Sequence, residues 1–296
     1  MGLVELASLA RPGQAGFIEP HLHVTLLAAE DGLALWHVRC SCPVSGFQAR
    51  EVTPEPLLVL VQRGSFARRT PRGRTRVDAG FGYFATPDVE EEFAHPEPGG
   101  DLSTSLMIAP HVLAGLTGGD VTLPARPVAI DACTYRRVRS LVAEVRTRTL
   151  DDWAEQALAL FEELLRAARS RPVAARRART AASHRAAIDA TREALIADPG
   201  LSVPELARVV GYSPSYLSRT FRRSTGTGIS AYRLRLRTRA AVARIEAGET
   251  NLAHLAAELG FADHSHLSRA VARETGATPT SIRLSSAASA PLASSA

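Results

Sequence analysis

The sequence predicts a multidomain α and β chain: an all-β barrel with a helical pair, followed by an all-α region that contains two helix-turn-helix units. Three observations predict this fold class. The length of 296 residues is about twice that of a common domain. The spacing of apolar residues changes from a period of 2 to a period of 3.6 after Pro127. A segment of about 15 residues then recurs within the last hundred residues.

The first 130 residues consist of short predicted strands separated by turns. Residues 24–29 and 33–39 flank Asp31-Gly32, a dipeptide that favours a two-residue hairpin turn. Further strands are expected at residues 57–62, 66–69, 74–77, 81–85, 91–94 and 102–108. Short strands at this regular spacing are typical of a small sandwich or barrel.

Two amphipathic helices are expected next, over residues 135–148 and 152–169, because their apolar residues form single stripes at helical spacing. The stripes could pack on the barrel or on a second subunit, and the sequence leaves both open. The predicted divisions are a barrel over 1–130, a helical pair over 131–170, a linker over 171–183, an all-α domain over 184–284 and a disordered tail over 285–296.

Charge divides the chain in the same way. Residues 1–170 hold 17 Arg and 21 acidic residues, a net charge of −4, whereas residues 171–296 hold 18 Arg and 9 acidic residues, a net charge of +9. The two values sum to the +5 of the whole chain, and every basic residue is Arg. A neutral-to-acidic part followed by a strongly basic part predicts that the second part binds a polyanion.

Several classes of protein are disfavoured. The apolar runs fall far below the roughly 20 residues of a membrane helix, and the first ten residues lack the basic start of a signal peptide. We therefore expect a cytoplasmic protein that makes no membrane contact. Cys40, Cys42 and Cys133 give neither a disulfide framework nor a four-ligand zinc pattern, so reduced thiols are expected.

The internal repeat has the pattern of a helix-turn-helix. Residues 205–219 realign with residues 254–269 after one inserted residue. In each copy a glycine, Gly211 or Gly260, opens the turn, because glycine tolerates the left-handed conformation at the end of a helix. Ser213 and Asp263 can then cap the second helix.

The second helix of each unit presents a polar face opposite its apolar stripe. At 100° per residue, the predicted DNA-binding residues are Ser215, Ser218, Arg219 and Arg222 in the first unit and Ser265, His266, Ser268 and Arg269 in the second. Hydroxyl and guanidinium groups suit base edges and phosphates. A helix expected over residues 229–247 measures about 28 Å, which can space the units by about one DNA turn of 34 Å. The sequence does not sort the arginines of this spacer between phosphates and intramolecular partners.

These residues resemble the double helix-turn-helix domain of AraC/XylS-type transcriptional regulators over about residues 188–283. The resemblance rests on Leu206-Ala207, Gly211-Tyr212-Ser213, Tyr216-Leu217-Ser218-Arg219, Phe221, Thr225-Gly226, Tyr232, Arg237, Ala241, Leu255-Ala256, Gly260-Phe261, Asp263, Ser265, Leu267-Ser268-Arg269, Gly276, Pro279 and Arg283.

The resemblance implies a sequence-specific regulator, commonly an activator, that binds double-stranded promoter DNA and meets RNA polymerase. It also implies a cupin-like N-terminal barrel that receives a small-molecule effector or mediates homodimerisation. Leu267 and Val271 replace larger usual residues, and Ala272 replaces a usual Lys. We therefore expect the second unit to contribute less to sequence recognition.

Catalytic and metal chemistry are not favoured. His21 and His23 form a His-x-His pair without a supporting Glu, and on a strand His37 faces away from Cys40 and Cys42. The sequence therefore predicts no metal site, no cofactor and no enzymatic activity. His95 and Asp101 flank a Pro/Gly loop and are weak candidates for effector binding. Two alternatives stay open: a cupin-type metal-dependent enzyme with a DNA-binding tail, and a constitutive architectural DNA binder.

Overall fold

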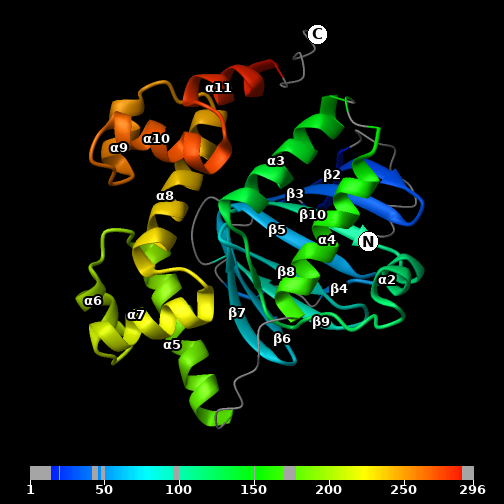
Figure 1. The fold of residues 1–296 in the computed structure, drawn as a ribbon, viewed down its shortest axis with the longest axis horizontal. Helices are drawn as coiled ribbons and strands as arrows, with labels where there is room; N and C mark the ends of the chain where they lie inside the picture. Colours follow the sequence, from blue (N-terminus) through cyan, green and yellow to red (C-terminus); the bar gives the residue numbers. More distant parts are fainter. Residues whose placement is uncertain are drawn as a thin grey trace. The chain divides into compact units, whose positions relative to one another are not determined.

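The computed structural model describes residues 15–19, 21–41, 46–47, 51–95, 100–147, 149, 151–169 and 178–288 (Figure 1). The chain divides into two compact units, Met1–Ser183 and His184–Ala296. Among the described residues, no helix is both long enough and apolar enough to cross a membrane.

The first unit consists of two antiparallel sheets. The larger sheet has the order β1-β2-β3-β10-β5-β8-β11, and the smaller has the order β4-β9-β6-β7. The strands are β1 (Ala15–Glu19), β2 (Leu22–Glu30), β3 (Leu33–Cys40), β4 (Glu51–Val52), β5 (Leu57–Arg63), β6 (Ser65–Thr70), β7 (Gly73–Asp78), β8 (Phe81–Ala85), β9 (Glu90–Ala94), β10 (Asp101–Ile108) and β11 (Val128–Ala129).

The predicted hairpin between β2 and β3 is present. Asp31 and Gly32 have φ angles of 37° and 81°, both in the left-handed region that a tight hairpin turn needs. Alternation along the strands gives the larger sheet two apolar faces. One face points toward the smaller sheet. On it, Leu57 and Val59 of β5 pack in one buried cluster with Phe66 of β6 in the smaller sheet. The fold-class prediction of an all-β barrel is confirmed.

The helical pair covers the other face of the larger sheet (Figure 1). The pair consists of α3 (Ala132–Thr147) and α4 (Trp153–Arg169), and a short helix, α2 (Pro110–Thr117), precedes it. Val138, Leu141 and Phe161 are buried in one cluster with Leu58 and Leu106 of the sheet. The apolar stripes therefore pack on the barrel, which decides between the two arrangements that the sequence left open.

The second unit is all α-helical. Its helices are α5 (Ala178–Ala197), α6 (Val203–Val209), α7 (Pro214–Thr225), α8 (Ile229–Glu246), α9 (Leu252–Glu258), α10 (His264–Thr275) and α11 (Pro279–Ala288). In Figure 1, α6 and α7 lie toward one end of α8, and α9 and α10 lie toward the other. The 18 residues of α8 correspond to about 27 Å at 1.5 Å per residue.

Beside two expected boundaries, the described residues are helical. Residues 178–183 were expected in the linker, but they form the first turns of α5, since Ala and Arg are strong helix formers. Residues 285–288 were expected in the disordered tail, but they end α11. Residues 171–177 and 289–296, like residues 1–10, residues 96–99 and Cys42, lie outside the described residues.

Candidate nucleic-acid interface and barrel interior

The first helix-turn-helix is built as its sequence predicts. Gly211 has φ +67°, so the chain turns sharply between α6 and α7. The hydroxyl of Ser213 accepts the Tyr216 amide at 3.3 Å and caps α7. Leu217 and Phe221 are fully buried on the inner face of α7. This packing fixes which face of α7 points outward.

The outward face of α7 carries the four predicted side chains. Ser215, Ser218, Arg219 and Arg222 are all exposed. Within the described part of the chain, Arg219 and Arg222 make no hydrogen bond or ion pair, so both guanidinium groups can bind another molecule. The Ser218 hydroxyl donates to the Pro214 carbonyl at 2.9 Å, which leaves it free to act as an acceptor.

The second helix-turn-helix has the same arrangement, but fewer of its predicted side chains are exposed. Ser265 and Arg269 are exposed on α10, whereas Ser268 and His266 are half-buried. The Asp263 carboxylate accepts the His266 amide at 2.6 Å, and this hydrogen bond lowers the pKa of Asp263.

The His266 side chain is engaged within its own turn. Its Nδ1 accepts the Ala262 amide at 3.4 Å, and its ring packs edge-on against Phe261 with 5.3 Å between centroids. The structure thus places His266 in the support of the turn, while Arg269 remains the basic group of the predicted set on this helix.

Two arginines of α8 tie both helix-turn-helix units to this helix. Arg233 donates to the Leu201 carbonyl at the start of the first unit. Arg237 donates to the Pro199 carbonyl at 2.6 Å and to the Gly260 carbonyl, in the second turn, at 2.7 Å. These contacts sort Arg233 and Arg237 into intramolecular roles and hold the two units at defined positions along α8.

Two further α8 arginines also have protein partners. Arg239 forms a buried ion pair with Glu274, with 2.6 Å between Nη2 and Oε1. Arg244 lies 3.1 Å from the Glu249 carboxylate at the surface. Arg235, which is half-buried, makes no hydrogen bond or ion pair with the described residues. Of the five α8 arginines, Arg235 is therefore the one without an intramolecular partner among the described residues.

In the barrel unit, three side chains from separate segments meet. His95 Nε2 lies 2.8 Å from Asp101 Oδ1, and His95 Nδ1 lies 4.0 Å from Cys40 Sγ. Burial lowers the pKa of His95, but the hydrogen bonds to Asp101 and Cys40 outweigh it and raise this pKa to about 10. Sequence reasoning singled out His95 and Asp101 and missed Cys40 as their neighbour.

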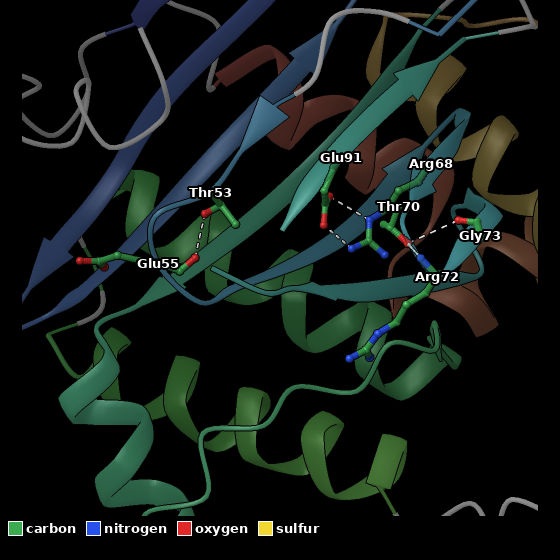
Figure 2. Close-up of polar contacts among 7 residues, drawn as sticks. All are labelled: Thr53, Glu55, Arg68, Thr70, Arg72, Gly73 and Glu91. Atoms are coloured by element: carbon green, nitrogen blue, oxygen red, sulfur yellow. Dashed lines mark hydrogen bonds and ion pairs between the residues drawn. The ribbon is translucent and has the colours of Figure 1, made fainter. Parts of the chain in front are cut away.

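A second buried polar group of the barrel is an ion pair. Figure 2 shows the Arg68 guanidinium from β6 meeting the Glu91 carboxylate from β9, with 2.9 Å between Nε and Oε2. The Arg68 guanidinium carbon also lies 4.3 Å from the centroid of the Tyr83 ring, and burial raises the pKa of Tyr83. The interior therefore combines buried charges with aromatic rings.

The other histidines considered from the sequence have different positions. His37 faces away from Cys40, as predicted, and its Nδ1 accepts from Arg146 of α3 at 2.6 Å. Among the described residues, His21 and His23 belong to no group of three or more converging His, Cys, Asp or Glu side chains.

Comparisons with known proteins agree with the helical unit. Residues 206–285 match the family model described as a helix-turn-helix domain. No curated protein matches the chain.

Three solved structures illustrate the similarity. An AraC-type DNA-binding domain-containing transcriptional regulator from Chromobacterium violaceum is 25% identical, over 36% of this chain and 96% of that chain, with a TM-score of 0.34. ToxT from Vibrio cholerae is 10% identical, over 86% of this chain and 98% of that chain, with a TM-score of 0.34. An RmlC-like cupin from Shewanella frigidimarina is 18% identical, over 33% of this chain and 85% of that chain, with a TM-score of 0.28.

Proposed function

We propose that this chain is a transcriptional regulator that recognises promoter DNA mainly through α7, and the match of residues 206–285 to a helix-turn-helix domain model supports this. The observation that carries the proposal is the outward face of α7. Arg219 and Arg222 are exposed there without a protein partner among the described residues, on a helix whose inner face is fully packed. An arginine in this position can grip guanine O6 and N7 with two hydrogen bonds.

The second unit supplies a weaker contact in this proposal. Ala272 offers no phosphate contact where a basic residue is usual, and His266 supports its own turn. The two helix-turn-helix units are attached to α8, which is about 27 Å long. This length is close to one DNA turn of about 34 Å, which supports contact with two successive major grooves. Arg235 then contributes a phosphate contact from α8.

The barrel unit is the part that we assign to a small-molecule effector. Buried Arg68, Glu91, His95 and Asp101 support this assignment, because polar groups converging among aromatic rings suit a ligand site better than a plain apolar core.

We also propose that this regulator is cytoplasmic, that it forms a homodimer and that it contacts RNA polymerase. The apolar stripes of α3 and α4 are used against the barrel, so a dimer would need another surface. The proposal assigns no catalytic reaction to the chain.

The test compares specific with non-specific binding. A preferred duplex is selected from random DNA with the full chain, and dissociation constants for this duplex and a scrambled one are measured over a salt series. We expect Arg219→Ala to reduce the ratio between the two affinities by roughly 5- to 150-fold, because a bidentate base contact is worth about 1–3 kcal/mol. Arg269→Ala should reduce the ratio less.

Arg185→Ala is the matched control, since Arg185 is an exposed arginine of the same unit on α5. It should weaken binding to both duplexes slightly and equally, as expected for a lost charge. An equal loss on both duplexes for Arg219→Ala would argue against base recognition by α7. A larger effect of Arg269→Ala than of Arg219→Ala would reverse the ranking of the units.

A further inference from the structure

Strand register brings a thiol, an imidazole and a carboxylate together at one end of the barrel unit. Cys40 ends β3 and Asp101 begins β10, and the two residues are direct partners in the antiparallel β3–β10 ladder. Direct partners project from the same face of a sheet, with Cβ atoms about 5 Å apart. His95, which follows β9, completes the group from the smaller sheet.

The backbone around this group is closely packed. Gly100 has φ +63°, and a Cβ at this position would lie 1.8 Å from the Cys40 carbonyl oxygen. A Cβ at Gly64 would lie 2.1 Å from the Gly100 carbonyl oxygen. Both glycines allow β3, β10 and the start of β6 to approach, so the positions of Cys40 and Asp101 are fixed by the fold.

The shape of the group distinguishes a metal site from a catalytic relay. Cys40 and Asp101 contact different nitrogens of the imidazole, as in a relay, but in a relay the thiol and the carboxylate lie on opposite sides of the ring, on the order of 7 Å apart. Here one ligand atom from each residue lies within 4.8 Å of each of the others. The thiol and the carboxylate are therefore close enough to each other to share one ion with the imidazole.

We propose that Cys40, His95 and Asp101 bind a single divalent ion of the zinc class. Thiolate, imidazole and carboxylate are the donors that Zn²⁺ takes in proteins, whereas Mg²⁺ and Ca²⁺ require oxygen donors. His95 and Asp101 are only 8% and 4% exposed, so their polar atoms are shielded from water. The hydrogen bond between them holds both side chains in place, and the ion replaces the proton that they share.

Three protein ligands leave one position of a tetrahedral ion open. This position can take a water molecule or a donor atom of a small molecule. If the barrel unit receives an effector, as proposed above, the ion supplies a coordination point for it. The metal site itself does not depend on that function, because it rests on the geometry of the barrel unit alone.

The experiment measures metal binding by the full chain in the absence of DNA. Protein stripped with a chelator is titrated with Zn²⁺ against a chromophoric indicator, and Co²⁺ is used as a spectroscopic probe. We expect one equivalent of Zn²⁺ and a thiolate-to-cobalt charge-transfer band. Cys40→Ser and Asp101→Asn should each weaken Zn²⁺ binding by at least about 100-fold, the upper range for loss of a supporting group.

The matched control is Cys133→Ser, which removes an exposed thiol of α3. It should leave both the affinity and the cobalt band unchanged. If the Cys40 or Asp101 variant does not fold, the cobalt spectra of Cys42→Ser and Cys133→Ser decide together, because the band must persist in both. Absence of the band, or no Zn²⁺ binding by the wild-type chain, would overturn the site, as would equal losses for Cys40→Ser and Cys133→Ser.

Failure of this site would leave the proposed regulator intact, because DNA selection and the Arg219 comparison do not require a bound ion. Conversely, a chain that binds zinc but shows no preference among duplexes would retain the metal site and lose the regulator assignment.

Discussion

At the scale of single residues, the protonation of His37 affects how stably the helix α3 packs on the barrel. The imidazole is half-buried and accepts a hydrogen bond from Arg146. Burial, together with the charges of Arg146 and Arg39, lowers the pKa of His37 to about 3. The native state therefore keeps His37 neutral down to about pH 3, whereas the unfolded chain protonates this histidine around pH 6.5.

We predict that this histidine makes the free energy of unfolding fall as the pH drops below 6.5. The unfolded chain binds a proton that the native chain does not, so stability is complete above the unfolded pKa and is lost toward pH 3. Between pH 6.5 and pH 5 the loss is about 2 kcal/mol. The free energy of unfolding is measured by urea unfolding at several pH values. It should depend less steeply on pH in His37→Gln than in the wild type. The control is His111→Gln, an exposed histidine of α2, and a wild-type slope in the His37 variant would contradict the prediction.

At the scale of elements, the two helix-turn-helix turns look alike but are supported differently. Gly211 and Gly260 have φ angles of +67° and +69°. A Cβ at Gly211 would meet nothing within 4 Å, whereas a Cβ at Gly260 would lie 3.0 Å from the guanidinium carbon of Arg237. The second turn therefore depends on close contact with α8, and the first does not.

We predict that Gly260→Ala is more damaging than Gly211→Ala. Each substitution costs about 1 kcal/mol for a side chain in the left-handed region. Gly260→Ala also displaces Arg237 from the Gly260 and Pro199 carbonyls, at about 1 kcal/mol for each hydrogen bond. Thermal or urea unfolding followed by helical circular dichroism measures both. Equal destabilisation would show that Arg237 does not stabilise the second turn.

The predicted elements that were found share a strong local signal. Eight strands and the helices of both repeats were identified because each has alternation, a cap or a turn dipeptide of its own. The strands β1, β4 and β11 and the helices α2, α5 and α11 were not predicted individually. The strands β4 and β11 have only two residues each, so their pairing partners rather than their own sequences define them, and α2 is a short helix of eight residues.

The helix-turn-helix surface and the Cys40 group of the barrel unit also differ in how much of each is predicted by local sequence. The outward residues of α7 and α10 lie within 12-residue helices, where a period of 3.6 fixes the exposed face. Cys40 and His95 are 55 residues apart, and only the register of β3 against β10 brings Cys40 beside Asp101. Alternation did predict that Cys40 and His37 face opposite ways.

At the scale of the whole molecule, each unit has a core of its own. The cluster around Leu58, Leu106 and Phe161 belongs to the first unit, and the cluster around Val242 and Leu267 belongs to the second. Both tryptophans of the chain, Trp36 and Trp153, lie in the first unit. Tryptophan fluorescence therefore monitors that unit alone.

We predict that DNA stabilises only the second unit. Thermal unfolding followed by tryptophan fluorescence should not shift when duplex is added at about 100 times its dissociation constant. The second unit should gain about 2.7 kcal/mol, seen by circular dichroism as a later loss of helix. A DNA-induced shift of the fluorescence transition would show that the two units unfold as one. Scrambled duplex at the same concentration serves as the control.

The sequence by itself determined the division into a β-rich unit and a basic helical unit, the second helix of each helix-turn-helix and most of the residues exposed on these two helices. Those properties follow from short-range periodicity, capping and charge, which act within one or two turns of chain. Only the tertiary structure decided which arginines of α8 are used inside the protein, that the helical pair covers the barrel, and that Cys40 meets His95 and Asp101. Each of these depends on contacts between segments far apart in sequence, and such contacts arise only when the strands pair and the helices pack.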